Sequence, residues 1–177
     1  MLETADASGE VLTVLSSRSA EGERREMPKW GYSMQLADES KIAKASLREV
    51  DASPKWTREV CAAIKGMYVE DAKRLLEDVI ARRRMIPYRR YRKLRAHHSE
   101  TKGPGGYPVK PARLLLKLLE SLEANAEFKG LDTSRLKIVH AAVHKGRMIK
   151  KFFQRAFGRA SPHNKTLIHI EVVAEQV

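Results

Sequence analysis

The 177-residue sequence contains one cysteine, Cys61, which excludes an intramolecular disulfide and fits a reducing compartment such as the cytoplasm. No apolar run approaches the roughly 20 residues that cross a bilayer. Residues 1–26 also lack the basic start and continuous apolar stretch of a secretory leader. We therefore expect a cytoplasmic protein without a membrane partner.

Acidic residues are almost missing from two long windows. Lys145 to Lys165 holds seven Lys or Arg residues and no Asp or Glu, and Arg82 to Arg113 holds eleven against one acid, Glu100. Solvated surfaces usually mix both signs, so these windows, with interleaved Tyr, Phe and Gly, favour phosphate contacts and stacking on unpaired bases. The net charge of +12 agrees with a nucleic-acid partner. RNA is favoured over DNA because no recognition-helix or zinc pattern occurs.

Charge also divides the chain into two parts. Residues 1–40 hold eight acidic and four basic side chains, whereas residues 41–177 hold fourteen acidic and thirty basic ones. We predict that residues 1–29 form a poorly ordered extension and that 30–177 form a single RNA-binding domain. Met27 is a second candidate for the start of the protein, which the intact mass of the native protein would test.

Periodic apolar residues predict three helices. The first begins at Pro54 with Ser53 as its N-cap and ends at Gly66. The second has Glu70 and Asp71 in its first turn and Arg82 to Arg84 in its last, which suits the helix dipole. The third runs from about Pro111 to Lys129 and is closed by Gly130. The buried stripe of the first helix is predicted to comprise Trp56, Val60, Ala63, Ile64 and Met67.

Strand signals lie at both ends of the remaining sequence. Residues 41–50 alternate weakly, and residues 136–143 and 166–174 have period-two patterns that flank the second basic window. We predict an α+β fold: three helices packed on a small antiparallel sheet, with a long protruding β-hairpin over about 144–165. A basic insertion loop is expected over about 85–108, with residues 103–108 as a turn without regular structure. An isolated two-stranded arm is marginal in water, so we expect this one to be ordered only when something packs around it.

No combination of residues indicates catalysis. His140 and His144 have metal spacing only on a helix, and they lie in strand sequence without Cys, Asp or Glu companions. His97 and His98 are more consistent with an RNA-facing pair, and Cys61 with a small packed side chain. We predict no enzyme activity, no metal and no cofactor.

Several segments together resemble the large-subunit ribosomal protein family numbered twenty-two, in its archaeal/eukaryotic form. They are Ser53-Pro-Lys, Tyr107-Pro-Val-Lys-Pro-Ala112, Asn125-Ala-Glu-Phe-Lys-Gly-Leu-Asp132, Ile138-Val-His-Ala141 and Arg155-Ala-Phe-Gly-Arg-Ala160. The resemblance covers about Trp30 to Val177 in order, and the chain ends soon after the last strand, which favours the archaeal type. The insertion loop is similar to the one that separates this form from the shorter bacterial form.

The resemblance implies a structural constituent of the large ribosomal subunit. Such a protein binds rRNA, links its domains during assembly and lines the nascent-polypeptide exit tunnel with its hairpin tip, here Arg155, Ala156, Phe157, Gly158, Arg159 and Ala160. Its partners are large-subunit rRNA, neighbouring ribosomal proteins near the tunnel exit and the nascent polypeptide. We assign rRNA binding to the cations of the two windows: Arg82, Arg83, Arg84, Arg89, Arg90, Arg92, Lys93, Arg95, Lys102, Lys110, Lys145, Arg147, Lys150, Lys151, Arg155, Arg159 and Lys165.

Two other functions remain open from the sequence. The chain is alternatively a free RNA-binding assembly or regulatory factor that associates transiently with the large subunit. An RNA-modifying enzyme is a third class, and no residues support it.

Overall fold

The computed structural model describes residues 31–34 and 39–177. The chain divides after Ser33, and the unit from Met34 to Val177 carries every element discussed below. The predicted extension over residues 1–29, with the candidate start at Met27, lies outside the described residues.

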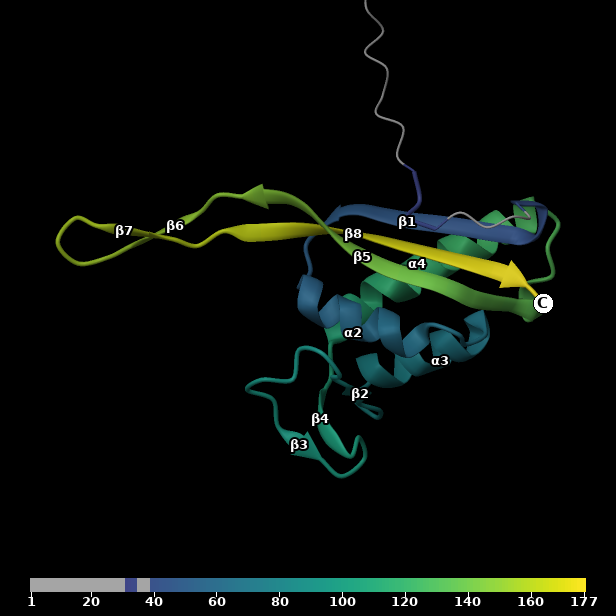
Figure 1. The fold of residues 1–177 in the computed structure, drawn as a ribbon, viewed down its shortest axis with the longest axis horizontal. Coiled ribbons are helices and arrows are strands. Elements are labelled where there is room, and N and C mark those ends of the chain that lie inside the picture. The colour runs from purple at the N-terminus through teal and green to yellow at the C-terminus, as the bar shows by residue number, and fades with distance from the viewer. Residues whose placement is uncertain (1–30, 35–38) are drawn as a thin grey trace, which may run out of the picture. The chain divides into compact units, whose positions relative to one another are not determined.

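A three-stranded antiparallel sheet forms the centre of this unit (Figure 1). Its order is β1 (Ile42–Val50), β8 (Lys165–Gln176) and β5 (Leu136–Ile149), so the last strand of the chain lies in the middle. The short 3-10 helices η1 (Glu39–Lys41) and η2 (Thr133–Arg135) precede β1 and β5. The period-two pattern predicted a buried face on β8, and this is confirmed, because Ile168, Ile170, Val172 and Ala174 are all fully buried.

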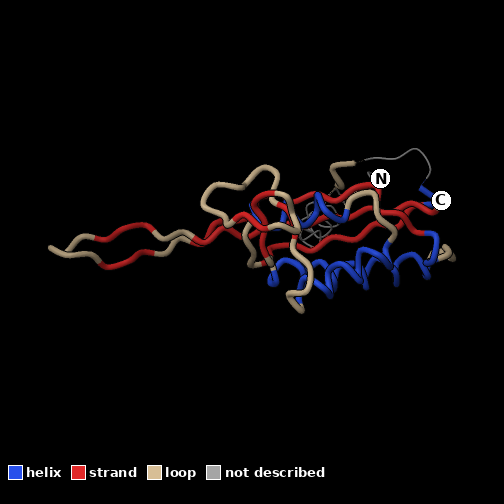
Figure 2. The backbone as a smooth tube through the Cα atoms, turned by 90° about the horizontal axis from the view of Figure 1, so that it is seen from below, coloured by secondary structure: helices blue, strands red, loops and turns tan. Residues whose placement is uncertain are grey.

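Three helices cover one face of the sheet (Figure 2). They are α2 (Pro54–Ile64), α3 (Val69–Ile80) and α4 (Val109–Phe128). Helix α4 packs on β1 and α3, and α2 packs on β5. The apolar stripe of α4 forms much of the core, with Leu115, Leu118, Leu119 and Leu122 at most 1% exposed. The predicted α+β class is therefore confirmed.

The helix ends show where the sequence rules hold and where they do not. Pro54 occupies the first position of α2, and Gly130, at φ +72°, closes α4, as predicted. The placement of Arg82, Arg83 and Arg84 in the last turn of α3 is wrong. The helix ends at Ile80, and Arg82 takes the left-handed conformation (φ +59°) of a Schellman motif, with Arg83 N–H donating to Asp78 O at 2.8 Å.

The buried stripe of α2 also differs from the prediction. Trp56 is only partly buried, and the guanidinium of Arg95 lies over its ring, 4.4 Å from the centroid. The fully buried positions of α2 include Thr57, Glu59 and Cys61 beside the expected Val60 and Ile64.

The insertion loop contains a small sheet of its own. Strands β2 (Ile86–Pro87), β4 (Gly103–Gly106) and β3 (His97–His98) pair antiparallel in the order β2-β4-β3. The expectation that residues 103–108 form a turn without regular structure is therefore wrong. Pro104 still offers its carbonyl, which accepts from Tyr88 N–H at 2.9 Å, so a Gly-Pro-Gly-Gly sequence can serve as the middle strand of short pairings.

The predicted hairpin is present as an extension of the central sheet. Strands β5 and β8 leave the sheet together and continue as β6 (Phe152–Gln154) and β7 (Ala160–Pro162), which form a projecting two-stranded arm (Figure 1). Residues 150–151 and 163–164 lie outside the strands and separate the two paired sections.

Candidate nucleic-acid interface

The tip of the arm is a tight turn over Arg155 to Arg159. Arg155 N–H donates to Arg159 O at 2.8 Å, and Arg159 N–H lies 3.4 Å from Ala156 O. Phe157 (φ +58°) and Gly158 (φ +67°) both take left-handed conformations, which is the pattern of a type I′ turn. The expected backbone role of Gly158 is thus present. Phe157 accepts the same unusual conformation with a bulky side chain that is 93% exposed, while Ala160 already belongs to β7.

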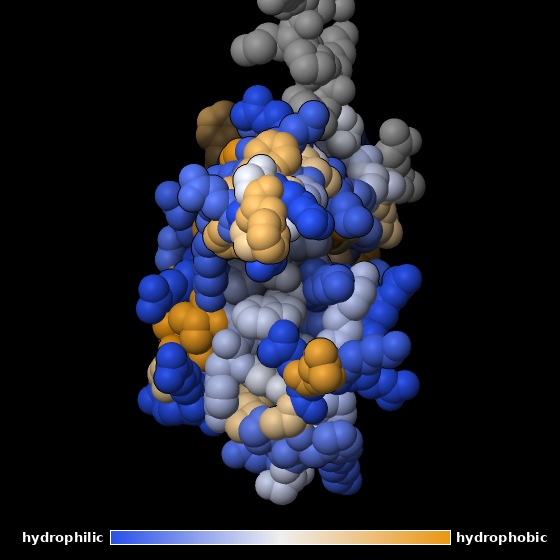
Figure 3. All heavy atoms as spheres, turned by 90° about the vertical axis from the view of Figure 1, so that its left-hand side faces the viewer, coloured by the Kyte–Doolittle hydropathy of each residue, from blue (hydrophilic) through white to orange (hydrophobic). Residues whose placement is uncertain are grey.

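The side chains of the arm are exposed cations and aromatic rings. Phe152 and Phe153 alternate along β6 and are 67% and 53% exposed, and the ring of Phe153 lies 4.3 Å from that of His163. Seen from the end of the arm, hydrophilic residues dominate the molecular face, with single hydrophobic side chains among them (Figure 3). Five exposed cations make no ion pair in the part of the chain that the structure describes: Lys145, Lys150, Lys151, Arg155 and Arg159.

At the root of the arm, by contrast, acids pair with three cations. Asp51 accepts from Lys110 at 2.6 Å and from Lys165 at 2.7 Å, and these hydrogen bonds lower the pKa of the Asp51 carboxyl. Glu49 pairs with Arg147 at 3.5 Å. Three of the cations predicted to bind rRNA therefore have intramolecular partners.

A close backbone approach also marks the root. A Cβ on Gly146 would lie 2.8 Å from Nε2 of His169 on the neighbouring strand, so only glycine fits there without a shift. The Nδ1 atom of the same imidazole accepts from Glu49 N–H at 3.0 Å. His169 on β8 thus contacts both β5, at Gly146, and β1, at Glu49, where the arm leaves the central sheet.

The insertion loop presents the second group of cations. The side chains of Arg82, Arg84 and Lys102 are exposed, and Arg83 pairs with Asp78 at 3.0 Å. Arg95 is half-buried between the rings of Trp56 and Tyr88. Four further exposed cations lie on one stretch after β2: Arg89, Arg90, Arg92 and Lys93.

Glu59 of α2 holds this stretch from beneath. Its carboxylate accepts from the backbone N–H groups of Arg89 at 2.9 Å, Arg90 at 3.1 Å and Tyr91 at 3.2 Å. Burial alone would raise the pKa of the Glu59 carboxyl. The hydrogen bonds from these amides and the nearby Arg58 guanidinium together outweigh burial, so the pKa lies below its ordinary value. The insertion therefore docks on a buried, ionised carboxylate.

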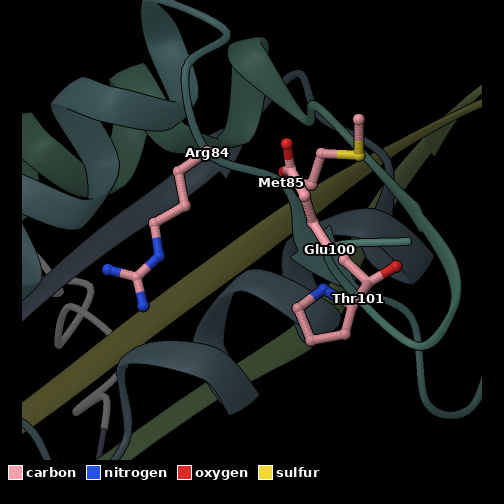
Figure 4. Close-up of a pocket in the computed structure, with 5 residues that line it drawn as sticks. Arg84, Met85, Glu100 and Thr101 are labelled. Atoms are coloured by element: carbon pink, nitrogen blue, oxygen red, sulfur yellow. The ribbon is translucent and has the colours of Figure 1, made fainter. Parts of the chain in front are cut away.

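A hollow of about 390 Å³ lies between the end of α3 and the insertion (Figure 4). Arg84, Met85, Pro87, Glu100 and Thr101 line it, and the Arg84 side chain points away from that of Met85. A mixed lining with one cation and one carboxylate has no preference for an anionic ligand. We assign no function to this hollow.

The remaining polar candidates are structural. Cys61 is buried, and desolvation raises the pKa of its thiol to about 12, which excludes a reactive thiolate at neutral pH. The statement that His140 and His144 lack acidic companions is wrong, because β8 brings Glu171 between them, with Oε1 at 3.2 Å from each Nε2. Among the described residues no group of three or more His, Cys, Asp or Glu side chains is arranged to hold a metal ion.

Two tyrosines of the insertion, Tyr88 and Tyr91, are poorly placed for stacking on bases. Tyr88 is only 4% exposed. The ring of Tyr91 faces two cations, with Lys55 Nζ at 5.7 Å and the Arg90 guanidinium at 5.9 Å from its centroid. The arm carries three exposed aromatic side chains, those of Phe152, Phe153 and Phe157.

Sequence reasoning missed the acids Glu49, Asp51 and Glu59. Glu59 had a usable signal, because it lies three residues after Trp56 and four before Ala63, within the apolar stripe of α2. A carboxylate at such a position needs a buried partner. The partners of Glu49 and Asp51 depend on strand register and had no comparable signal.

No helix in the described ranges is long and apolar enough to span a membrane.

Comparisons with known proteins identify relatives over most of the chain. The family model described as ribosomal protein L22p/L17e matches residues 45–175. A large ribosomal subunit protein uL22 of Thermofilum pendens is 50% identical over 151 residues, which are 85% of this chain and 99% of that protein. Its counterpart in Nitrosopumilus maritimus is 44% identical over 152 residues, covering 85% and 100%. These archaeal matches confirm the resemblance drawn from the motifs and the archaeal type: the chain belongs to the ribosomal protein L22p/L17e family.

Proposed function

We propose that this chain is a structural constituent of the large ribosomal subunit in the cytoplasm, where it binds rRNA through its arm and its insertion. One observation carries the proposal: a two-stranded arm with five exposed cations that no acid in the described chain neutralises. In agreement with the prediction that the chain is not an enzyme, its relatives are named as ribosomal proteins.

The arm requires a partner on more than one side. Phe152 and Phe153 are neighbours on a strand and so point to opposite faces, and both are more than half exposed. A flat partner would cover one face and leave the other in water. Folded RNA can surround the arm, neutralise its cations with converging phosphates and offer bases to its aromatic rings. In this way the arm would link separate rRNA domains during assembly.

The tip is the part that we assign to the wall of the peptide exit tunnel. Its residues Arg155 to Ala160 match the motif on which the family resemblance rests. Arg155 and Arg159 would bind phosphates and give the wall positive charge, and the exposed Phe157 would meet either a base or the nascent polypeptide. Neighbouring ribosomal proteins near the tunnel exit would contact the domain from which the arm projects.

Salt-washed mature subunits distinguish this function from the alternative of a transient assembly or regulatory factor. We expect one copy of the chain in each mature large subunit after a high-salt wash, because the arm would be enclosed by RNA. A chain that appears only in precursor particles, or leaves in the wash, would favour the transient factor.

Photo-crosslinking tests the assignment of the tip. A photoreactive phenylalanine at Phe157 should crosslink to large-subunit rRNA or to nascent chains in translating ribosomes. The matched control places the same probe at Phe128 on α4, which is 94% exposed but lies outside the arm. Equal nascent-chain crosslinking from both positions, or no crosslink from Phe157 to either rRNA or nascent chains, would contradict a tunnel-lining tip.

A further inference from the structure

Glu59 is a nearly completely buried carboxylate, and most of its hydrogen bonds come from the insertion rather than from its own helix. The side chain is 1% exposed. Oε2 accepts from Arg89 N–H, while Oε1 accepts from Arg90 N–H, Tyr91 N–H and the Arg58 guanidinium at 3.2 Å. Both carboxylate oxygens are thus used, and three of the four donors are consecutive backbone amides of one loop.

These hydrogen bonds use the backbone and leave the cationic side chains available. Arg89, Arg90, Arg92 and Lys93 remain exposed and make no ion pair within the described residues. We call these four side chains the phosphate platform. Because Glu59 is paired with amides, it fixes the direction of this stretch without neutralising the platform itself.

A second contact fixes the far end of the same stretch. The Arg95 guanidinium lies 4.4 Å from the centroid of the Trp56 ring, and Trp56 is on the same helix as Glu59. The stretch before the platform is held by Tyr88 N–H, which donates to Pro104 O of β4. The platform is therefore anchored on both sides and from beneath.

We propose that Glu59 is a positioning residue that preorganises the phosphate platform to bind the sugar-phosphate backbone of rRNA. The inference rests on the proposed function, since it assumes an rRNA partner. Cations that are held in place before binding lose less conformational freedom when they meet phosphates. The burial of Tyr88 and the cations around Tyr91 agree with backbone contacts here rather than base stacking.

The sign of one substitution separates positioning from simple electrostatics. Glu59→Gln removes a negative charge next to the platform, so long-range electrostatics alone predicts tighter binding to RNA. Positioning predicts weaker binding, because the glutamine amide brings its own N–H donors against amides that need an acceptor. The two explanations therefore differ in direction and not only in size.

The test uses the full chain and deproteinised archaeal large-subunit rRNA as the probe. We expect Glu59→Gln to weaken binding roughly 3- to 10-fold at fixed salt, in line with the ordering cost of about one side chain. Hydrogen exchange of the Arg89, Arg90 and Tyr91 amides should accelerate. The control is Arg74→Gln on α3, where Arg74 pairs with Glu70 and Asp71. It changes charge away from the insertion and should leave both readouts unchanged.

A thermodynamic cycle with a platform-neutralised variant completes the test. In that variant Arg89, Arg90, Arg92 and Lys93 are all changed to Gln, and adding Glu59→Gln should cause no further loss of affinity. Unchanged or tighter binding by Glu59→Gln, or an equal loss in the neutralised background, would overturn the proposal. If Glu59→Gln does not fold, the platform-neutralised variant still tests the proposal. Wild-type affinity for rRNA in that variant would show that the platform does not bind phosphates and would overturn the proposal. Failure of the wild-type chain to bind rRNA would instead overturn the proposed function.

Discussion

Removing the charge of the arm tip should weaken rRNA binding without destabilising the domain. The perturbation is the double change Arg155→Gln and Arg159→Gln. Both side chains are exposed, and the hydrogen bond that Arg155 Nε donates to Ser161 Oγ at 3.2 Å is on the surface. We therefore expect the free energy of unfolding to change by no more than about 0.5 kcal/mol per substitution.

The effect on binding follows from counterion release. If each arginine neutralises one phosphate, the slope of log affinity against log salt should become shallower by roughly 1.4 to 1.8. Extrapolated from about 1 M to about 0.15 M salt, that slope difference corresponds to roughly a 15- to 30-fold loss of affinity. A fluorescence-anisotropy titration over a salt series measures both quantities.

The matched control is again Arg74→Gln, whose charge is paired with Glu70 and Asp71 on α3. This variant should keep the wild-type slope. A tip variant that also keeps the wild-type slope would show that Arg155 and Arg159 do not neutralise phosphates. A tip variant that loses its cooperative unfolding transition would refute the statement that the domain folds independently of the tip.

Three further predictions concern the insertion, the core and the turn. The fold lowers the pKa of Glu59 from 4.5, so the stability that its ionised carboxylate contributes is complete above pH 4.5 and is lost as the pH falls through the lower folded pKa. The backbone amide chemical shifts of the insertion should therefore titrate with a midpoint below pH 4.5, and a midpoint above pH 4.5 would contradict the hydrogen bonds to Glu59. Leu119→Ala, at a fully buried site, should cost about 2 to 5 kcal/mol in denaturant unfolding, and a cost under about 1 kcal/mol would contradict its place in the core. Gly158→Val should strain the left-handed turn by about 1 to 2 kcal/mol, so binding to large-subunit rRNA, which we expect to order the arm, should weaken roughly 5- to 30-fold while the melting temperature of the free chain stays unchanged; wild-type affinity would refute the turn assignment.

Local signals in the sequence were sufficient for most element boundaries. Pro54 and Gly130 each act through their own backbone, so their effects could be read without knowing the fold. The end of α3 could not be predicted in this way, because Arg82 takes a left-handed conformation for which glycine is the usual signal. Phe157 at the tip is the same kind of exception, since a bulky residue there is allowed only because its side chain points into open space.

Contacts between distant segments were beyond sequence reasoning. Strand β4 has a sequence that disfavours strands and forms because β2 and β3 supply partners on both sides. The approach of Glu171 to His140 and His144 depends on the register of β5 against β8, including a bulge between Ile138 and His140. The basic windows, in contrast, were visible at once, but the sequence did not distinguish the cations that pair with Glu49 and Asp51 at the root from those of the outer arm.

Strands β5 and β8 belong both to the central sheet and to the arm. The face that each strand residue buries in the core therefore determines which side of the arm the following side chains face. Trimming one residue from each leg would keep cross-strand neighbours opposed but turn the outer side chains to the other side. Trimming two from each leg would shorten the arm and preserve its sidedness. Natural or engineered changes in arm length should therefore come in even steps on both legs.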